Sequence, residues 1–231
     1  MPRYFTPAVF AFLRELADNN NKEWWEGNKD RYVETIREPA RDFIADFGGR
    51  LAEISPHFSA DTRTNGGSLM RPYRDMRFAS DKTPYKTNVG IQFRHKRGKD
   101  VHAPGFYLHL EPGRSFAGAG MWSPEPRVAR RIRQAISDEP REWERAAHSQ
   151  SFTSNWAIGE HDEERLRRVP RELNGNGHPY PEDLRLKSFT AGAKLSQKLV
   201  TSEHFPDELL ALYVSAGPYT KFLCEAISVE F

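Results

Sequence analysis

The chain has 231 residues, of which 38% are hydrophobic, 12% aromatic and 29% charged. This composition argues against a disordered chain, because the aromatic side chains can supply large buried areas to a core. The 34 lysines and arginines against 32 acidic residues leave a net charge of +2, which argues against nucleic-acid binding driven by overall charge. The single cysteine, Cys224, excludes an intramolecular disulfide framework and a zinc site built from cysteines alone.

No apolar segment reaches the ~20 residues that a membrane-spanning helix needs. The first residues, MPRYFTPAVF, lack the hydrophobic region of a signal peptide. We therefore expect a soluble, cytoplasmic protein without a membrane partner. The length fits a single domain over residues 1–231, and the sequence gives no indication of oligomeric state.

The first part of the chain is predicted to be helical. Thr6-Pro7 has the N-cap hydroxyl and first-turn proline of a helix start, and hydrophobic residues follow at helical spacing to Ala17. The run Asn19–Asn21 is expected to end that helix and cap a second one. Pro39 is expected to kink this second helix or to begin a third, whose apolar stripe reaches Ile54.

The middle of the chain has the alternating pattern of half-buried strands. Hydrophobic and polar residues alternate over 89–94 and over 106–111, and Pro112-Gly113 then turns the chain into a third strand over 114–122. We therefore predict an antiparallel β-meander over 89–122, with a further strand around Ser68–Tyr73.

The last part returns mainly to helix. Ser123-Pro124 predicts a helix start, short helices are expected over 139–148 and 162–168, and a final helix is expected from Pro206, with Cys224 buried in it. Short strands are expected over 184–189 and 198–201. Helices, a meander and more helices predict an α+β fold in which the antiparallel sheet packs with N-terminal, middle and C-terminal helices.

Common catalytic and phosphate-binding signatures are absent from the sequence. It contains no G-x-x-x-x-G-K-[ST], G-x-G-x-x-G, H-E-x-x-H or G-x-S-x-G, and no two of its eight histidines have a recognised metal-ligand spacing. We therefore predict no metal site and assign no cofactor. A metal-dependent hydrolase using His109 with Asp75 or Glu111 is a weaker alternative, and the sequence does not decide whether the protein is an enzyme.

The most informative segment is RDMRFASDKTPYKTN, residues 74–88, which is dense in charge and in turn-forming residues. Together with Arg71 it places five cations within sixteen positions. If residues 68–78 were extended, Arg71, Asp75 and Arg77 would share one face. Arginine forks bind phosphate and carboxylate through two parallel hydrogen bonds, and a turn from Asp81 to Pro84 would bring the following residues back toward the arginines.

Two hypotheses account for this segment. The first is a site for a phosphate- or carboxylate-bearing ligand, either a small molecule such as a nucleotide or a nucleic-acid backbone. The residues expected to bind that ligand are Arg74, Asp75, Arg77, Asp81, Lys82, Tyr85 and Lys86. The second is a structural or interaction protein in which Asp75 and Asp81 pair with the arginines in a buried ion-pair network.

The segment also carries a resemblance to a known family. With NNNKEWWEGNKDRY before it and GFYLHLEPGRSFAGAGMW after it, the chain resembles the domain-of-unknown-function family numbered twenty-four sixty-one. The matching positions outside the segment are Asn19, Asn20, Trp24, Trp25, Arg168, Pro170, Leu186, Lys187 and Phe189. Two departures are Pro72, in the predicted strand, and the shifted glycine register over 118–122.

The resemblance implies no established activity. It does bear on the two hypotheses, because a family pattern of Arg, Asp, Lys, Tyr and Asn is more than core packing requires. Such a pattern is what an anion site or a polar network would demand.

Overall fold

A six-stranded antiparallel sheet forms the centre of the computed structural model, which describes residues 4–75, 77, 81–97, 104–159, 165–173 and 177–231. The strand order is β1-β2-β3-β4-β6-β5, and the predicted meander is its central part. The strands are β1 Phe58–Ser59, β2 Val89–His95, β3 Gly105–Leu110, β4 Phe116–Met121, β5 Ala157–Ile158 and β6 Phe189–Lys194. Together with the helices they confirm the predicted α+β fold.

The α-helices lie before, between and after the strands along the chain. They are α1 Pro7–Asp18, α2 Lys22–Tyr32, α3 Glu38–Ile54, α4 Pro126–Asp138, α5 Pro140–Trp143, α6 Gln150–Thr153, α7 Gln197–Val200, α8 Phe205–Ser215 and α9 Gly217–Ala226. Shorter π- and 3₁₀-helical turns are Val33–Arg37, Glu144–His148, Arg171–Leu173 and Asp183–Arg185. No helix within the described part of the chain is both long and apolar enough to cross a membrane.

The first two helices begin where their capping residues predict. The Thr6 hydroxyl accepts a hydrogen bond from the Ala8 N–H at 3.3 Å, and the Asn21 side chain accepts one from the Trp24 N–H at 3.0 Å. Pro39 lies near the start of α3, but the π-helical turn Val33–Arg37 joins α2 to α3 with helical φ and ψ angles on both sides, and the Glu38 N–H donates to the Val33 carbonyl. Pro39 therefore interrupts the hydrogen bonding of a continuous helical stretch and does not begin a separate helix.

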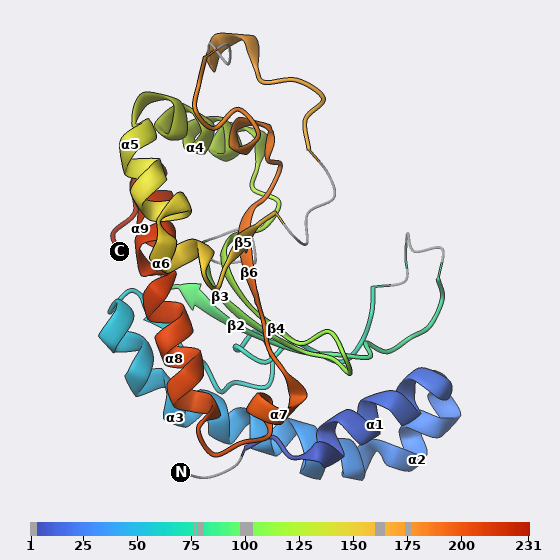
Figure 1. Cartoon of the computed structure of the whole chain (residues 1–231). Helices are drawn as coiled ribbons and strands as arrows, with labels where there is room; N and C mark the ends of the chain where they lie inside the picture. The colour runs from blue at the N-terminus through green and yellow to red at the C-terminus, as the bar shows by residue number, and fades with distance from the viewer. Residues whose placement is uncertain (1–3, 76, 78–80, 98–103, 160–164, 174–176) are drawn as a thin grey trace.

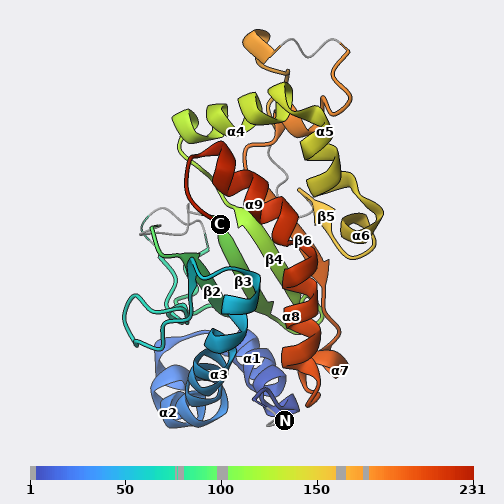
Figure 2. The ribbon, with the colours of Figure 1, turned by 90° about the vertical axis from the view of Figure 1, so that its left-hand side faces the viewer.

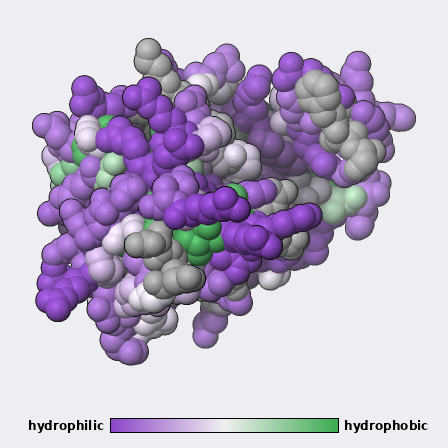
Figure 3. Space-filling view, turned by 90° about the horizontal axis from the view of Figure 1, so that it is seen from above, coloured by the Kyte–Doolittle hydropathy of each residue, from purple (hydrophilic) through white to green (hydrophobic). Residues whose placement is uncertain are grey.

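One face of the sheet carries the core. In Figure 2, α3, α8 and α9 lie in front of the sheet, and Figure 1 shows α1 and α2 at its lower end. Phe47 of α3 stacks on Phe93 of β2 at 5.2 Å between ring centroids, and Tyr213 of α8 packs on Phe106 of β3 at 4.8 Å. Cys224 is buried in α9, as predicted. Seen from above, the protein surface is mostly hydrophilic, with a small hydrophobic group near the centre (Figure 3).

The predicted strand around Ser68–Tyr73 is wrong. Only isolated bridges form there, between Leu69 and Ile91 and between Tyr73 and Tyr85. Pro72 lacks the N–H that a continuous ladder requires, so the segment crosses from one partner to another instead of following either.

Four expectations for the second half also need correction. Helix α4 begins at Pro126 with Glu125 as its N-cap, whereas Ser123 lies outside the helix with a positive φ of 44°. Residues 198–201 lie in and just after α7, whose Ser196 cap accepts from the Leu199 N–H at 3.1 Å. The strand expected over 184–189 begins only at Phe189. The helix expected over 162–168 lies partly outside the described residues, and Arg165, within its described part, forms a bridge with Leu186 instead.

Two buried and two half-buried tyrosines make the fold sensitive to alkali. Burial raises the pKa of Tyr32 and of Tyr107 to about 12, and raises the pKa of Tyr213 and Tyr219 well above the ordinary value of 10.0. These phenols stay neutral in the folded state but ionise near pH 10 once unfolded. Their stabilising contribution is therefore complete below pH 10 and is lost as the pH rises toward 12.

We expect the free energy of unfolding, measured with urea at a series of pH values, to fall steeply between pH 10 and 12. A Tyr32→Phe variant, which removes one of these ionisations, should lose less over the same range. A free energy of unfolding that stays constant from pH 9 to 12 would contradict this account.

Candidate ligand-binding site

The charge-dense segment folds back on itself as its turn residues predict. The Arg74 N–H donates to the Pro84 carbonyl at 2.9 Å, and the Lys86 N–H donates to the Pro72 carbonyl at 2.7 Å. The turn is held by Asp81, whose carboxylate accepts from the Thr83 N–H at 2.9 Å. Residues 72–74 and 84–86 therefore lie side by side, and Lys86 returns to the start of the segment.

This folded segment is fixed to the helical layer by its Tyr85. The Asn20 side chain donates to the Tyr85 carbonyl at 2.9 Å and accepts from the Tyr85 N–H at 3.0 Å, as a neighbouring strand would. The Tyr85 ring is 4% exposed and stacks on Trp25, with ring centroids 4.3 Å apart and planes 14° apart. Three of the matched family residues are thus explained by structure, and Tyr85 presents its ring to Trp25 rather than to an open surface.

Replacing Asn20 with alanine should lower the free energy of unfolding by about 1–3 kcal/mol, because it leaves a buried backbone donor and acceptor unpaired. The matched control is Asn19→Ala, since the Asn19 side chain only donates to the Glu15 carbonyl at an exposed helix end. Chemical denaturation of both variants checks the prediction. Equal losses of unfolding free energy in the two variants would show that the Asn20–Tyr85 pairing does not contribute to stability.

The predicted arginines pair with the predicted aspartates, but at the surface. Arg77 Nη2 lies 2.6 Å from Asp75 Oδ2, with side chains 78% and 61% exposed. Arg74 binds Asp81 and the Thr83 hydroxyl around the turn. The Arg77 hydrogen bond lowers the pKa of Asp75 to about 2, and the Thr83 N–H, followed by Arg74, lowers the pKa of Asp81 to about 2.

The ion pairs of the second hypothesis therefore form, but the network is not buried. Lys82 is exposed at the tip of the turn. The arginines that seemed the best anion ligands already have carboxylate partners, which reduces what they can offer to a ligand.

Two other cations of the same segment have a different environment. Among the described residues, no acidic side chain forms an ion pair with Arg71 or Lys86. Burial, and then the positive charge of Arg71, lower the pKa of Lys86 below the ordinary value of 10.5. Both side chains line an open hollow of about 920 Å³, whose wall also includes Arg94, the Gly66-Gly67 turn and the paired arginines.

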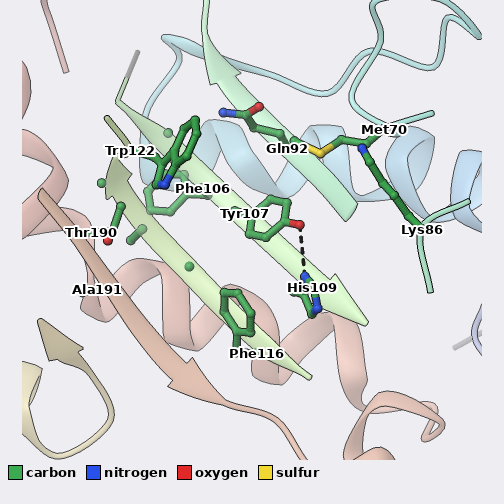
Figure 4. A pocket seen from close by; sticks show the side chains of 14 residues that line it. Met70, Lys86, Gln92, Phe106, Tyr107, His109, Phe116, Trp122, Thr190 and Ala191 are labelled. Carbon is green, nitrogen blue, oxygen red and sulfur yellow. Dashed lines mark hydrogen bonds between the residues drawn. The ribbon is translucent and has the colours of Figure 1, made fainter. Parts of the chain in front are cut away.

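A second cavity, of about 510 Å³, adjoins this hollow on the face of the sheet opposite α3, α8 and α9. Met70 and Lys86 line both spaces. Figure 4 shows these two side chains on one side of the cavity, Trp122 and Thr190 on the other, and Tyr107 between them. The remaining lining residues are Gln92, Gly105, Phe106, His109, Phe116, Gly118, Ala119, Gly120 and Ala191. The cavity is thus floored largely by aromatic side chains and glycines.

Glycines on the two neighbouring strands make room for Tyr107. A Cβ on Gly90 of β2 would lie 2.8 Å from the Tyr107 hydroxyl and 3.0 Å from Met70 Sδ. A Cβ on Gly118 of β4, which pairs with Tyr107 in the register, would lie 3.3 Å from Tyr107 Cβ. Gly90 has no positive φ that would require glycine, so the absence of its side chain serves the position of the Tyr107 hydroxyl.

Polar side chains continue from Tyr107 along the same face. The Tyr107 hydroxyl lies 3.1 Å from His109 Nδ1, and His109 Nε2 lies 3.1 Å from Glu111 Oε2. The side-chain amide of Asn88, the last residue of the charge-dense segment, lies 3.4 Å from His109 Nδ1. The segment therefore contributes both Lys86 and Asn88 to this region.

The structure divides the predicted site residues into groups. Arg74, Asp75, Arg77, Asp81 and Lys82 lie on the exposed turn, Tyr85 lies against the core, and Lys86 lies between the two hollows. Within the described residues, no group of three or more His, Cys, Asp or Glu side chains could hold a metal ion. His109 does contact Glu111, whereas Asp75 lines the outer hollow instead.

Sequence reasoning placed Arg71 on a face with Arg77 that could hold an anion but left it out of the expected ligand-binding residues, and it did not select Asn88, Tyr107 or Trp122 for the site. Strand alternation had indicated that Tyr107, His109 and Glu111 share a face. A further sign of the cavity is that glycines alternate in the sequence of β4. Their place beside Tyr107 can be recognised only once the strand register is known.

Comparison with known proteins gives one match. The family model described as conserved hypothetical protein (DUF2461) matches residues 8–222. Searches of curated proteins and of solved structures found no significant match. The family match covers nearly the whole chain and includes Asn20 and Trp25, the charge-dense segment and the sheet. The chain therefore belongs to the DUF2461 family of conserved hypothetical proteins.

Proposed function

We propose that this protein binds a phosphate- or carboxylate-bearing ligand in the hollow lined by Arg71 and Lys86, in the cytoplasm. The observation that carries this proposal is the environment of Lys86. It is a half-buried cation beside a second cation, with no carboxylate paired to either among the described residues.

Such an arrangement is unfavourable in the empty protein and favourable with an anion. Burial and the repulsion from Arg71 both oppose the charged form of Lys86, as the lowered pKa of Lys86 shows. An anion placed between the two side chains would replace this repulsion with two charge-assisted hydrogen bonds. Arg71 and Lys86 can therefore stabilise a bound anion more strongly than Arg77 and Arg74 can. The charges of Arg77 and Arg74 are already compensated by Asp75 and Asp81.

The adjoining cavity supports a ligand that carries a planar ring as well as an anionic group. Its lining of Tyr107, Phe116 and Trp122 suits a flat, apolar surface, and Lys86 lies at its edge. A nucleotide combines the two features, with phosphate at the Arg71 and Lys86 end and the base in the cavity. A nucleic-acid backbone shares the phosphate chemistry alone and would use the outer hollow.

The test is a thermal-shift screen of the purified protein with inorganic phosphate, mononucleotides, small carboxylates and a single-stranded oligonucleotide. We expect phosphate to raise the melting temperature and a mononucleotide to raise it further at equal concentration. An Arg71→Gln, Lys86→Gln variant should lose these shifts.

The control for that screen is Arg77→Gln, which removes an exposed cation with a carboxylate partner. It should leave both the shifts and the stability without ligand nearly unchanged, since exposed ion pairs contribute little. If no anion in the screen shifts the wild-type protein, the site is not an anion site, and the alternative of a structural or interaction protein is favoured.

A further inference from the structure

The side chains of Tyr107, His109 and Glu111 form a hydrogen-bonded chain on the cavity face of β3. The two contacts, Tyr107 Oη to His109 Nδ1 and His109 Nε2 to Glu111 Oε2, are each 3.1 Å. A carboxylate can only accept, so the neutral imidazole carries its proton on Nε2, and Nδ1 accepts from the Tyr107 hydroxyl. A nucleophile, a base and a carboxylate that orients the base stand in this order in enzymes that form covalent intermediates.

The surroundings hold this chain in place and leave it accessible. The His109 ring stacks on Phe116 with centroids 4.7 Å apart and planes 17° apart, and Gly90 provides the space for the Tyr107 hydroxyl. The His109 and Glu111 side chains are 16% and 23% exposed. In Figure 4 the Tyr107 hydroxyl points toward the side of the cavity that carries Lys86. The chain therefore lies beside the anion site rather than in the core.

We propose that Tyr107 is the nucleophile of a phosphoryl-transfer reaction, with His109 as its general base and Glu111 as the residue that positions His109. The substrate class is a phosphate ester whose anionic oxygens bind Lys86 and Arg71, so this inference rests on the proposed function. The apolar cavity would receive the ester's organic group.

The reaction has two balanced steps. The Tyr107 oxygen attacks phosphorus while its proton passes to His109 Nδ1; a bond from phosphorus to tyrosine oxygen forms, and the bond to the alcohol oxygen breaks. The departing alcohol oxygen, which leaves on the side of phosphorus opposite Tyr107, takes a proton from water. In the second step, water attacks the phosphotyrosine from that same side and loses a proton to the solvent, while His109 returns its proton to the Tyr107 oxygen as the phosphorus–tyrosine bond breaks.

The base is essential to this chemistry. Burial, with a smaller contribution from the Glu111 charge, raises the pKa of Tyr107 to about 12, so the phenol is neutral at neutral pH. It can act as a nucleophile only if its proton is removed as the new bond forms, which is the role assigned to His109.

The experiment uses 4-nitrophenyl phosphate and bis(4-nitrophenyl) phosphate with the full-length protein, following nitrophenolate release and the mass of acid-quenched protein. We expect release from at least one ester and a phosphoryl adduct on the peptide containing Tyr107. Tyr107→Phe, which keeps the ring, should abolish both signals. His109→Gln should lower the rate ~10²–10⁴-fold, and Glu111→Gln should lower the rate with little change in KM.

The matched control is Tyr180→Phe, because Tyr180 also contacts a histidine, stacking on His148 at 4.2 Å, but lies outside both hollows. It should retain the full rate. Circular dichroism of each variant checks that it is folded.

Three outcomes would overturn the inference. Release that survives in folded Tyr107→Phe, an adduct on another residue, or neither release nor adduct from either ester would each exclude Tyr107 as the nucleophile. Phosphate binding measured in parallel separates the two proposals. Binding without an adduct refutes only the catalytic inference, whereas the absence of binding refutes the anion site as well.

Discussion

Replacing Trp25 with alanine is expected to lower the free energy of unfolding by about 3–5 kcal/mol, the usual cost of removing a buried tryptophan. Trp25 is 1% exposed, stacks on Tyr85 at 4.3 Å and contacts Tyr32 at 4.9 Å. Its loss leaves a large cavity between α2 and the charge-dense segment. Urea denaturation measures the effect.

A second variant separates the ring from its polar atom. The Trp25 indole N–H has no hydrogen-bond partner among the described residues, so Trp25→Phe keeps most of the stacking and loses no hydrogen bond. It should cost much less than Trp25→Ala. A double-mutant cycle with Tyr85→Ala should show a coupling of about 0.5–1.5 kcal/mol between the rings. Equal losses in the alanine and phenylalanine variants would contradict the stacking account.

The second large effect concerns ligand binding. Lys86→Glu should weaken phosphate binding ~10²–10³-fold, because it removes a charge-assisted hydrogen bond and adds repulsion, about 3–4 kcal/mol in total. Stability without ligand should fall little or even rise, since the substitution replaces the Lys86–Arg71 repulsion with attraction. Equilibrium dialysis with labelled phosphate, together with a denaturation curve, measures both quantities. A large loss of stability in Lys86→Glu would indicate a structural role for Lys86 instead.

Local rules of sequence predicted much of the fold. The caps at Thr6 and Asn21, the alternation over 89–122 and the turn at Asp81 depend on residues close together in the chain, so their consequences could be read directly. The pairing of Asn20 with Tyr85 joins residues 65 positions apart, and nothing local distinguishes Asn20 from the asparagines on either side.

The site was harder to predict because short-range pairing replaced the expected strand. Asp75 accepts from the Arg77 N–H at 3.2 Å, a turn that competes with extended backbone, and it also binds the Arg77 side chain. Arg77 is thereby compensated locally, and Arg71, which alternation had placed beside it, lines the hollow with Lys86. These contacts determine which basic side chain has no carboxylate partner, and the composition of the segment does not predict them.

The cavity could not be predicted from the sequence either. Alternation along β3 places Tyr107, His109 and Glu111 on one face, but the space above them depends on Gly90 and Gly118 lying on the neighbouring strands. That juxtaposition follows from strand register. Register in turn follows from pairings that only the folded chain reveals.

The central claim is that Lys86 and Arg71, rather than the paired arginines of the exposed turn, hold an anion. Isothermal titration calorimetry of inorganic phosphate tests it most directly, with wild type, Lys86→Gln and Arg77→Gln compared at one ionic strength. We predict binding to wild type and to Arg77→Gln with nearly equal affinity, and at least tenfold weaker binding to Lys86→Gln. Equal affinity in wild type and Lys86→Gln, or loss of binding in Arg77→Gln alone, would contradict it.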